Sequence, residues 1–147
     1  MNTRSDLGNY INENYRYKKS VKLHLNKEEN LNNKIENTFL PHPNFNNLIK
    51  EFDPNNELKI LLKISKNKAQ KIKEDIDYPI SKKLVFKIII CLKLTIDEAE
   101  KLLNSLSYYF DSSSYFDLAI KYCLINQIYD EKSIKYLLKE AGINAKI

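Results

Sequence analysis

Lysines and side-chain amides gather in one short stretch of the chain, between residues 66 and 73. Asn and Gln can pair bidentately with adenine, and Lys can reach guanine or phosphate groups. Two further lysines, at 82 and 83, open a later predicted helix and can hold phosphates there. The candidate base-contacting residues are Lys66, Asn67, Lys68, Gln70 and Lys71, and the candidate phosphate-contacting residues are Lys73, Lys82 and Lys83. These residue types indicate nucleic-acid binding.

The positive charge of the chain is concentrated around these residues. The whole chain has 24 basic and 19 acidic residues, a net charge of +5. Residues 59–93 contain ten lysines and three acidic residues, a local charge of +7, so the remainder is net negative. A basic segment of this kind favours a polyanionic partner. The alternative interpretation is a solvated lysine-rich face in a chain that uses Lys freely.

The sequence offers little for other chemistry. With 2 Gly in the chain there is no glycine-rich phosphate loop. Cys91 and Cys123 lie inside apolar helical patterns and are typical of buried free thiols. Because His24 and His42 stand far from both in sequence, we expect no zinc site. The acidic residues at 97–100 favour the first turn of a helix rather than a paired-carboxylate site. We therefore expect no enzymatic activity, no cofactor and no metal.

The N-terminal residues lack a charged-then-apolar signal pattern, and no apolar run approaches the length of a membrane span. We therefore expect a cytoplasmic protein that does not enter a membrane.

The elements that position the candidate residues are predicted helices. Apolar residues recur with helical spacing from residue 45 onward, and N-cap residues such as Ser65 and Ser81 precede several of the patterns. Thr95 and Glu98 form a capping box. The predicted fold is all-α, with about five short helices followed by two C-terminal helices. The predicted helices span 45–52, 55–63, 66–73, 82–92 and 96–105, then one capped by the serines at 112–114 and one between Asp130 and Gly142.

Residues 1–44 differ from the rest and are predicted to form a partly flexible arm before a helical domain at 45–147. Residues 5–14 predict a short helix, with Leu7, Tyr10 and Ile11 on one face. The alternation of apolar and polar residues at 21–25 predicts a short strand. Whether the arm folds alone, packs on the domain or orders on binding stays open at this stage.

The predicted helices at 55–63 and 66–73, joined by a tight turn at residues 64 and 65, have the layout of a helix-turn-helix motif. In that motif the second helix lies in the major groove. Short helix pairs joined by tight turns also occur in helical domains that do not bind DNA. The spacing alone therefore leaves both interpretations open.

Residues 57–107 resemble lambda-repressor-like (xenobiotic-response-element type) helix-turn-helix domains, in a bacterial variant sometimes found with macro domains. The resemblance extends over about residues 38–142, and Gln70 and Lys73 replace the Ser and Arg of the family pattern. It implies a five-helix DNA-binding core, two further helices and a regulatory role. The matching residues are Lys71-Ile72-Lys73, Tyr78-Pro79-Ile80-Ser81-Lys82-Lys83, Leu92-Lys93-Leu94, Asp97-Glu98-Ala99-Glu100-Lys101-Leu102-Leu103, Tyr109, Ser112-Ser113-Ser114-Tyr115-Phe116-Asp117, Ile120-Lys121-Tyr122 and Tyr129-Asp130.

Two functions follow as expectations. The first is a non-enzymatic helix-turn-helix regulator that binds duplex DNA, from a phage or mobile element. The second is a phage-encoded inhibitor of a host defence nuclease, of the anti-CRISPR type, that binds protein or guide RNA through the helical domain. Helix-turn-helix proteins often dimerise, and residues 115–141 are the expected surface for a homodimer.

Overall fold

The computed structural model describes residues 3–16 and 44–144. Every regular element in these two segments is an α-helix, so the predicted all-α class is confirmed for them. The predicted strand at 21–25 lies outside the described residues. In chain order the helices are α1 (Thr3–Asn14), α4 (Phe45–Phe52), α5 (Leu58–Leu62), α6 (Lys66–Glu74), α7 (Lys82–Cys91), α8 (Ile96–Ser105), α9 (Tyr115–Ile125) and α10 (Glu131–Glu140).

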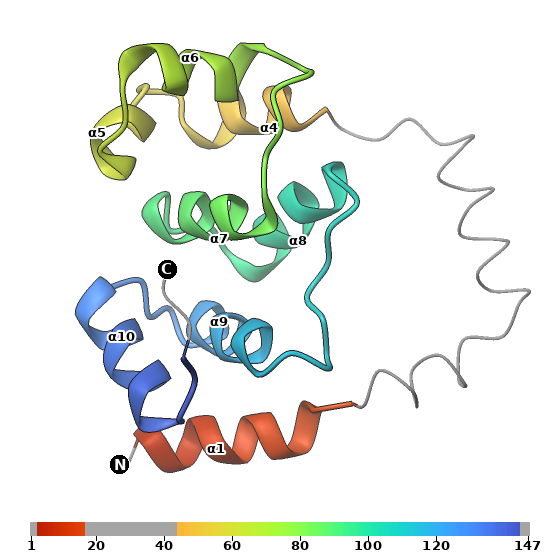
Figure 1. The fold of residues 1–147 in the computed structure, drawn as a ribbon, viewed down its shortest axis with the longest axis vertical. Coiled ribbons are helices and arrows are strands. Elements are labelled where there is room, and N and C mark those ends of the chain that lie inside the picture. The colour runs from red at the N-terminus through yellow and green to blue at the C-terminus, as the bar shows by residue number, and fades with distance from the viewer. Residues whose placement is uncertain (1–2, 17–43, 145–147) are drawn as a thin grey trace, which may run out of the picture.

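The helices form three tiers, which Figure 1 shows from the side. One outer tier holds α4, α5 and α6, the middle tier holds α7 and α8, and the other outer tier holds α9, α10 and α1. Because α7 lies between two tiers, it is buried around most of its circumference. Phe86 and Ile90 are therefore buried together with Val85, Ile88 and Ile89.

The starts of the helices follow the predicted N-caps. The side chains of Ser65, Ser81 and Asp130 each accept a backbone N–H from the first turn of their helix. The predicted capping box at the start of α8 is present. Of the serines at 112–114, Ser114 is the cap of α9. The hydroxyl and carboxylate groups satisfy amides that have no partner inside the helix.

Five of the described helices end in the same way, with one residue in the left-handed region. After α7, for example, the Lys93 N–H donates to the Ile90 carbonyl and the Leu94 N–H donates to the Ile89 carbonyl. This is the Schellman arrangement, in which an apolar residue usually follows the left-handed one. The left-handed residues are Lys63, Lys93, Ser107, Gln127 and Gly142, with φ between 53° and 72°.

Helix α5 is shorter than the 55–63 predicted from the sequence. The Asp53 carboxylate accepts the N–H groups of Glu57 and Leu58, at 2.8 and 3.1 Å, and so caps a helix that begins only at Leu58. Asn56 has a φ of 54°, which does not continue a right-handed helix. Within α5, Leu58 is buried but Leu61 is exposed.

Helix α1 packs on the C-terminal helices, which resolves for residues 3–16 the question that the sequence left open. The Leu7 side chain is completely buried. The Tyr10 ring lies 5.6 Å from the Tyr122 ring of α9. After the helix, the Arg16 N–H donates to the Ser112 carbonyl at 2.8 Å. This part of the predicted arm is therefore attached to the body of the protein.

Candidate nucleic-acid interface

Helix α6 presents one continuous polar surface to the solvent. Ala69 and Ile72 anchor it to the core, and the Ser65 side chain caps its first turn. The five residues predicted for base contact all lie on its solvent side. These exposed residues are Lys66, Asn67, Lys68, Gln70 and Lys71.

A tight turn at residues 63–65 joins α5 to α6. Lys63 takes the left-handed conformation, and the Ile64 N–H donates to the Lys59 carbonyl at 3.1 Å. Ile64 packs against the core and so fixes the exit from the turn. Two short helices thus meet across three residues, as in the predicted helix-turn-helix layout.

The charges in the first turn of α6 oppose the helix dipole. This turn carries Lys66 and Lys68 and no acidic residue, whereas the last turn carries Lys71 and Lys73 as well as Glu74. Cations near a helix N-terminus and anions near its C-terminus are each unfavourable, by about 0.3–1 kcal/mol. At the N-terminus the lysines and the free backbone N–H groups attract the same anions. The arrangement costs stability but suits an anionic partner.

Lys73 does not belong to the phosphate-contacting group, and this prediction is wrong. Its Nζ lies 2.7 Å from Asp53 Oδ2, and it also donates to the Asn56 side chain at 2.5 Å. The exposed fraction of its side chain is 11%. Lys73 therefore holds α6 against the loop before α5 and has no free charge for a phosphate.

Lys82 is also engaged within the protein, whereas Lys83 is exposed. The Lys82 ammonium pairs with the Asp117 carboxylate at the start of α9. It also lies over the rings of Phe86 and Tyr109, 5.6 and 5.5 Å from their centroids. Because Asp117 compensates its charge, Lys82 connects the middle tier to α9 and is removed from the candidate interface. Lys83 stays in the interface.

Two residues that were not predicted at the site belong to it, Lys59 on α5 and Glu74 at the end of α6. A hollow of about 640 Å³ separates the start of α5 from α6, with Lys59 and Lys66 among its lining residues and Leu58 at its base. Glu74 lines the same hollow. Lys59 was visible in the sequence only as part of the charge count. Its place at the site depends on how α5 packs beside α6.

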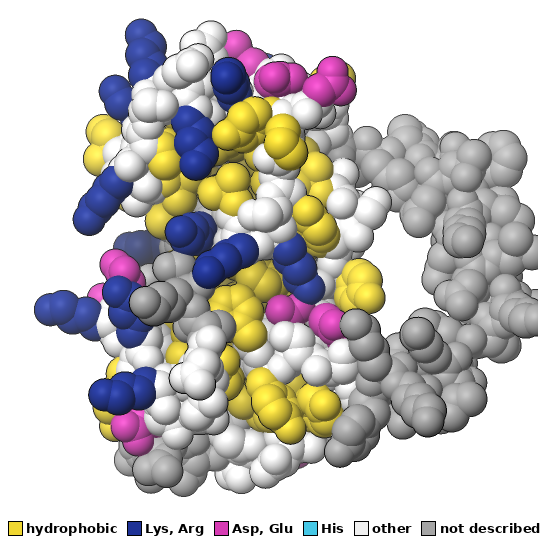
Figure 2. Space-filling model, viewed as in Figure 1, with side chains coloured by type: hydrophobic (Ala, Val, Ile, Leu, Met, Phe, Trp, Pro, Cys, Tyr) yellow, Lys and Arg dark blue, Asp and Glu magenta, His cyan; other side chains and the backbone are white. Residues whose placement is uncertain are grey.

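Lysine side chains extend beyond α6. Figure 2 shows dark blue Lys and Arg side chains over all three tiers of the face in view, with acidic side chains at its upper edge and others among the lysines lower down. The basic surface is therefore broader than the predicted helix-turn-helix.

Of the two thiols predicted to be buried, one is buried and the other is half-buried. Cys123 is buried, and burial raises the pKa of its thiol to about 12. Cys91 is half-buried and its thiol donates to the Leu61 carbonyl, 3.7 Å away. Burial, and then the nearby Glu131 carboxylate, raise the pKa of Cys91. Both thiols are therefore uncharged at neutral pH.

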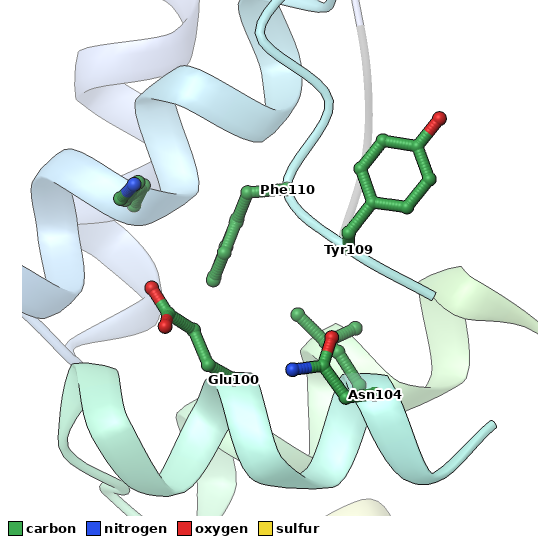
Figure 3. A pocket seen from close by; sticks show the side chains of 6 residues that line it. Glu100, Asn104, Tyr109 and Phe110 are labelled. Carbon is green, nitrogen blue, oxygen red and sulfur yellow. The ribbon is translucent and has the colours of Figure 1, made fainter. Parts of the chain in front are cut away.

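A small pocket of about 190 Å³ lies between α8 and α9. Figure 3 shows Glu100 and Asn104 rising from α8 toward Phe110, while the Tyr109 ring points away. The volume of this pocket is below the roughly 300–1,000 Å³ of ordinary ligand pockets. Within residues 3–16 and 44–144, no three His, Cys, Asp or Glu residues are placed to share a metal ion. The helices of these segments are also too short or too polar to cross a membrane.

Comparisons with family models, curated proteins and solved structures found no match to this chain. The resemblance to lambda-repressor-like domains therefore stays a prediction from the residues that carry it. Function has to be inferred from the geometry and charge of α5, α6 and α7.

Proposed function

We propose that this protein is a non-enzymatic regulator that binds duplex DNA with α6 in the major groove. The observation that carries the proposal is the solvent side of α6, where lysines and amides follow a tight turn after α5. The major groove of B-DNA is about 12 Å wide and admits one α-helix. The two lysines in the first turn of α6, placed against the helix dipole, further favour a polyanion.

The exposed side chains divide by the contacts they can make. Asn67 and Gln70 carry amides that can pair with adenine, and Lys68 and Lys71 can reach guanine or a nearby phosphate. Lys83 at the start of α7 and Lys59 on α5 flank α6 and are suited to the phosphate backbone. Phosphate contacts would set the affinity and the amides would contribute the base preference.

The first test is fluorescence anisotropy of mixed-sequence duplex DNA over a series of salt concentrations. We expect affinity to fall steeply with salt, because each Lys–phosphate contact releases counterions. The double charge reversal Lys68→Glu with Lys71→Glu should weaken binding by roughly 100-fold or more at low salt, since two attractive contacts become repulsive.

The matched control is Lys101→Glu with Lys132→Glu, which changes the net charge equally at exposed positions on α8 and α10. It should keep most of the affinity, and circular dichroism should show the same helix content for both variants. Equal losses in the two double variants would mean that net charge alone drives binding and would reject α6 as the contact surface.

A protein-binding role is the second candidate, favoured by apolar side chains that flank α6. Ile60 on α5 is 76% exposed and Ile76, just after α6, is 68% exposed. Exposed apolar groups beside a basic helix suit a protein partner. If neither duplex DNA nor structured RNA binds at low salt, the proposal becomes an inhibitor of a host defence nuclease, of the anti-CRISPR type.

A further inference from the structure

Glu74 occupies the solvent-facing surface of α6 together with the candidate base-contacting residues. It is exposed, and it follows Asn67 by seven residues and Gln70 by four, so the three side chains share one face of the helix. It lines the hollow that contains Lys59 and Lys66, and also a second hollow of about 340 Å³ that contains Asn67 and Lys71. A helix that enters the major groove with this face brings an acidic group with it.

This face carries both hydrogen-bond donors and acceptors. Lys66, Lys68 and Lys71 supply only donors, whereas the Glu74 carboxylate supplies acceptors. The Gln70 amide nitrogen donates to Glu74 Oε2 at 3.5 Å, which engages one of its donors inside the pair. Lysine donors therefore extend along the face as far as Lys71, and the Glu74 carboxylate adds acceptors at its C-terminal end.

We propose that Glu74 is a specificity-determining residue of the DNA-binding surface, a proposal that rests on the proposed function. With Gln70, it accepts hydrogen bonds from the exocyclic amino group of cytosine or adenine. In the major groove these are the bases that offer an amino donor, whereas guanine and thymine present acceptors at the equivalent positions. A carboxylate facing guanine O6 or thymine O4 would be repelled, so these bases are disfavoured at the position that Glu74 reaches.

The same carboxylate lowers binding to DNA in general. A carboxylate in the major groove is flanked by the phosphates of both strands, so the charge of Glu74 opposes theirs. A DNA site with an amino group at this position regains part of the lost affinity through a hydrogen bond to Glu74, and a site without an amino group does not. Glu74 thus raises discrimination by weakening the binding of wrong sequences.

The test is a selection from randomised duplexes by the intact chain, followed by affinity measurements on the selected site and its single-base variants. We expect the wild-type site to hold cytosine or adenine at one position. Replacing that base by guanine or thymine should weaken binding roughly tenfold or more. In Glu74→Gln, whose amide both donates and accepts, this difference should shrink to about twofold or less, and binding to mixed-sequence DNA should become tighter.

Glu51→Gln is the matched control, because it removes the same charge from an exposed position on α4. It should keep the wild-type base preference. An unchanged preference in Glu74→Gln, with sequence-selective binding intact, would overturn the role of Glu74 and leave the proposed function standing. If the wild-type chain binds no duplex at low salt, the proposed function and the role of Glu74 both fail.

Discussion

At the scale of single residues, two lysines of one helix have different roles. Lys71 and Lys73 lie two positions apart on α6, yet Lys71 is exposed and Lys73 is buried against Asp53. The sequence held part of this information, because Lys73 follows the inward-facing Ala69 by four residues and shares its face. Its partner lies twenty residues earlier, before α5. No local pattern identifies such a contact, and so the prediction for Lys73 failed.

Replacing Lys73 should therefore affect stability rather than DNA affinity. In Lys73→Met the buried Asp53 carboxylate loses its cationic partner, and the free energy of unfolding should fall by about 3 kcal/mol. The exposed neighbour supplies the control, since Lys71→Met should change stability by less than about 0.5 kcal/mol. Urea denaturation measures both. A stable Lys73→Met protein with weakened DNA binding would return Lys73 to the interface.

At the scale of the helices, the sequence predicted starts better than ends. Hydroxyl and carboxylate caps such as Ser65 and Asp130 stand directly before the helices they cap, so their roles can be inferred locally. The ends are harder, because glycine usually marks the left-handed residue that stops a helix. Here Lys, Ser or Gln occupies four of the five left-handed ends. The start of α5 was also misplaced, because the Asp53 carboxylate and the conformation of Asn56 define it.

The left-handed ends predict where the protein can be stabilised. A side chain makes the left-handed conformation costly, and glycine removes that cost while increasing the entropy of the unfolded chain. Ser107→Gly and Gln127→Gly should each raise the free energy of unfolding by about 0.5–1 kcal/mol. Gly142→Ala reverses the change at the equivalent end of α10 and should lower it. Urea denaturation of the three variants measures these changes in the free energy of unfolding. Loss of stability in both glycine variants would contradict this account.

At the scale of the whole molecule, the three tiers are connected by contacts that no sequence pattern predicts. Lys82 pairs with Asp117 and thereby joins α7 to α9, although the sequence placed the two residues in separate helices and predicted Lys82 as a phosphate contact. The packing of α1 on α9 could not be predicted either, because the sequence shows the apolar face of α1 but not the helix that covers it. Ile125 and Tyr136 of the C-terminal helices are exposed, and the homodimer through residues 115–141 stays a prediction.

The attachment of α1 predicts that it unfolds together with the rest of the described structure. Leu7 is completely buried, so Leu7→Ala should lower the free energy of unfolding by about 2–5 kcal/mol. The exposed Asn9 on the same helix is the control, and Asn9→Ala should have little effect. Thermal unfolding followed by circular dichroism and by tyrosine fluorescence should give coincident transitions. Unchanged stability in Leu7→Ala would show that α1 detaches independently.

The contact between α1 and α9 also orders events during synthesis. Tyr10 precedes its partner Tyr122 by more than 100 residues. A ribosome adding about 5–20 residues per second needs roughly 5–20 s to make the intervening chain. The helices α4 to α8, which pack on one another without needing a residue beyond Ser105, can assemble in that interval. The apolar face of α1 is left in water until α9 and α10 emerge, which makes it the segment of the nascent chain that a chaperone has the longest time to capture.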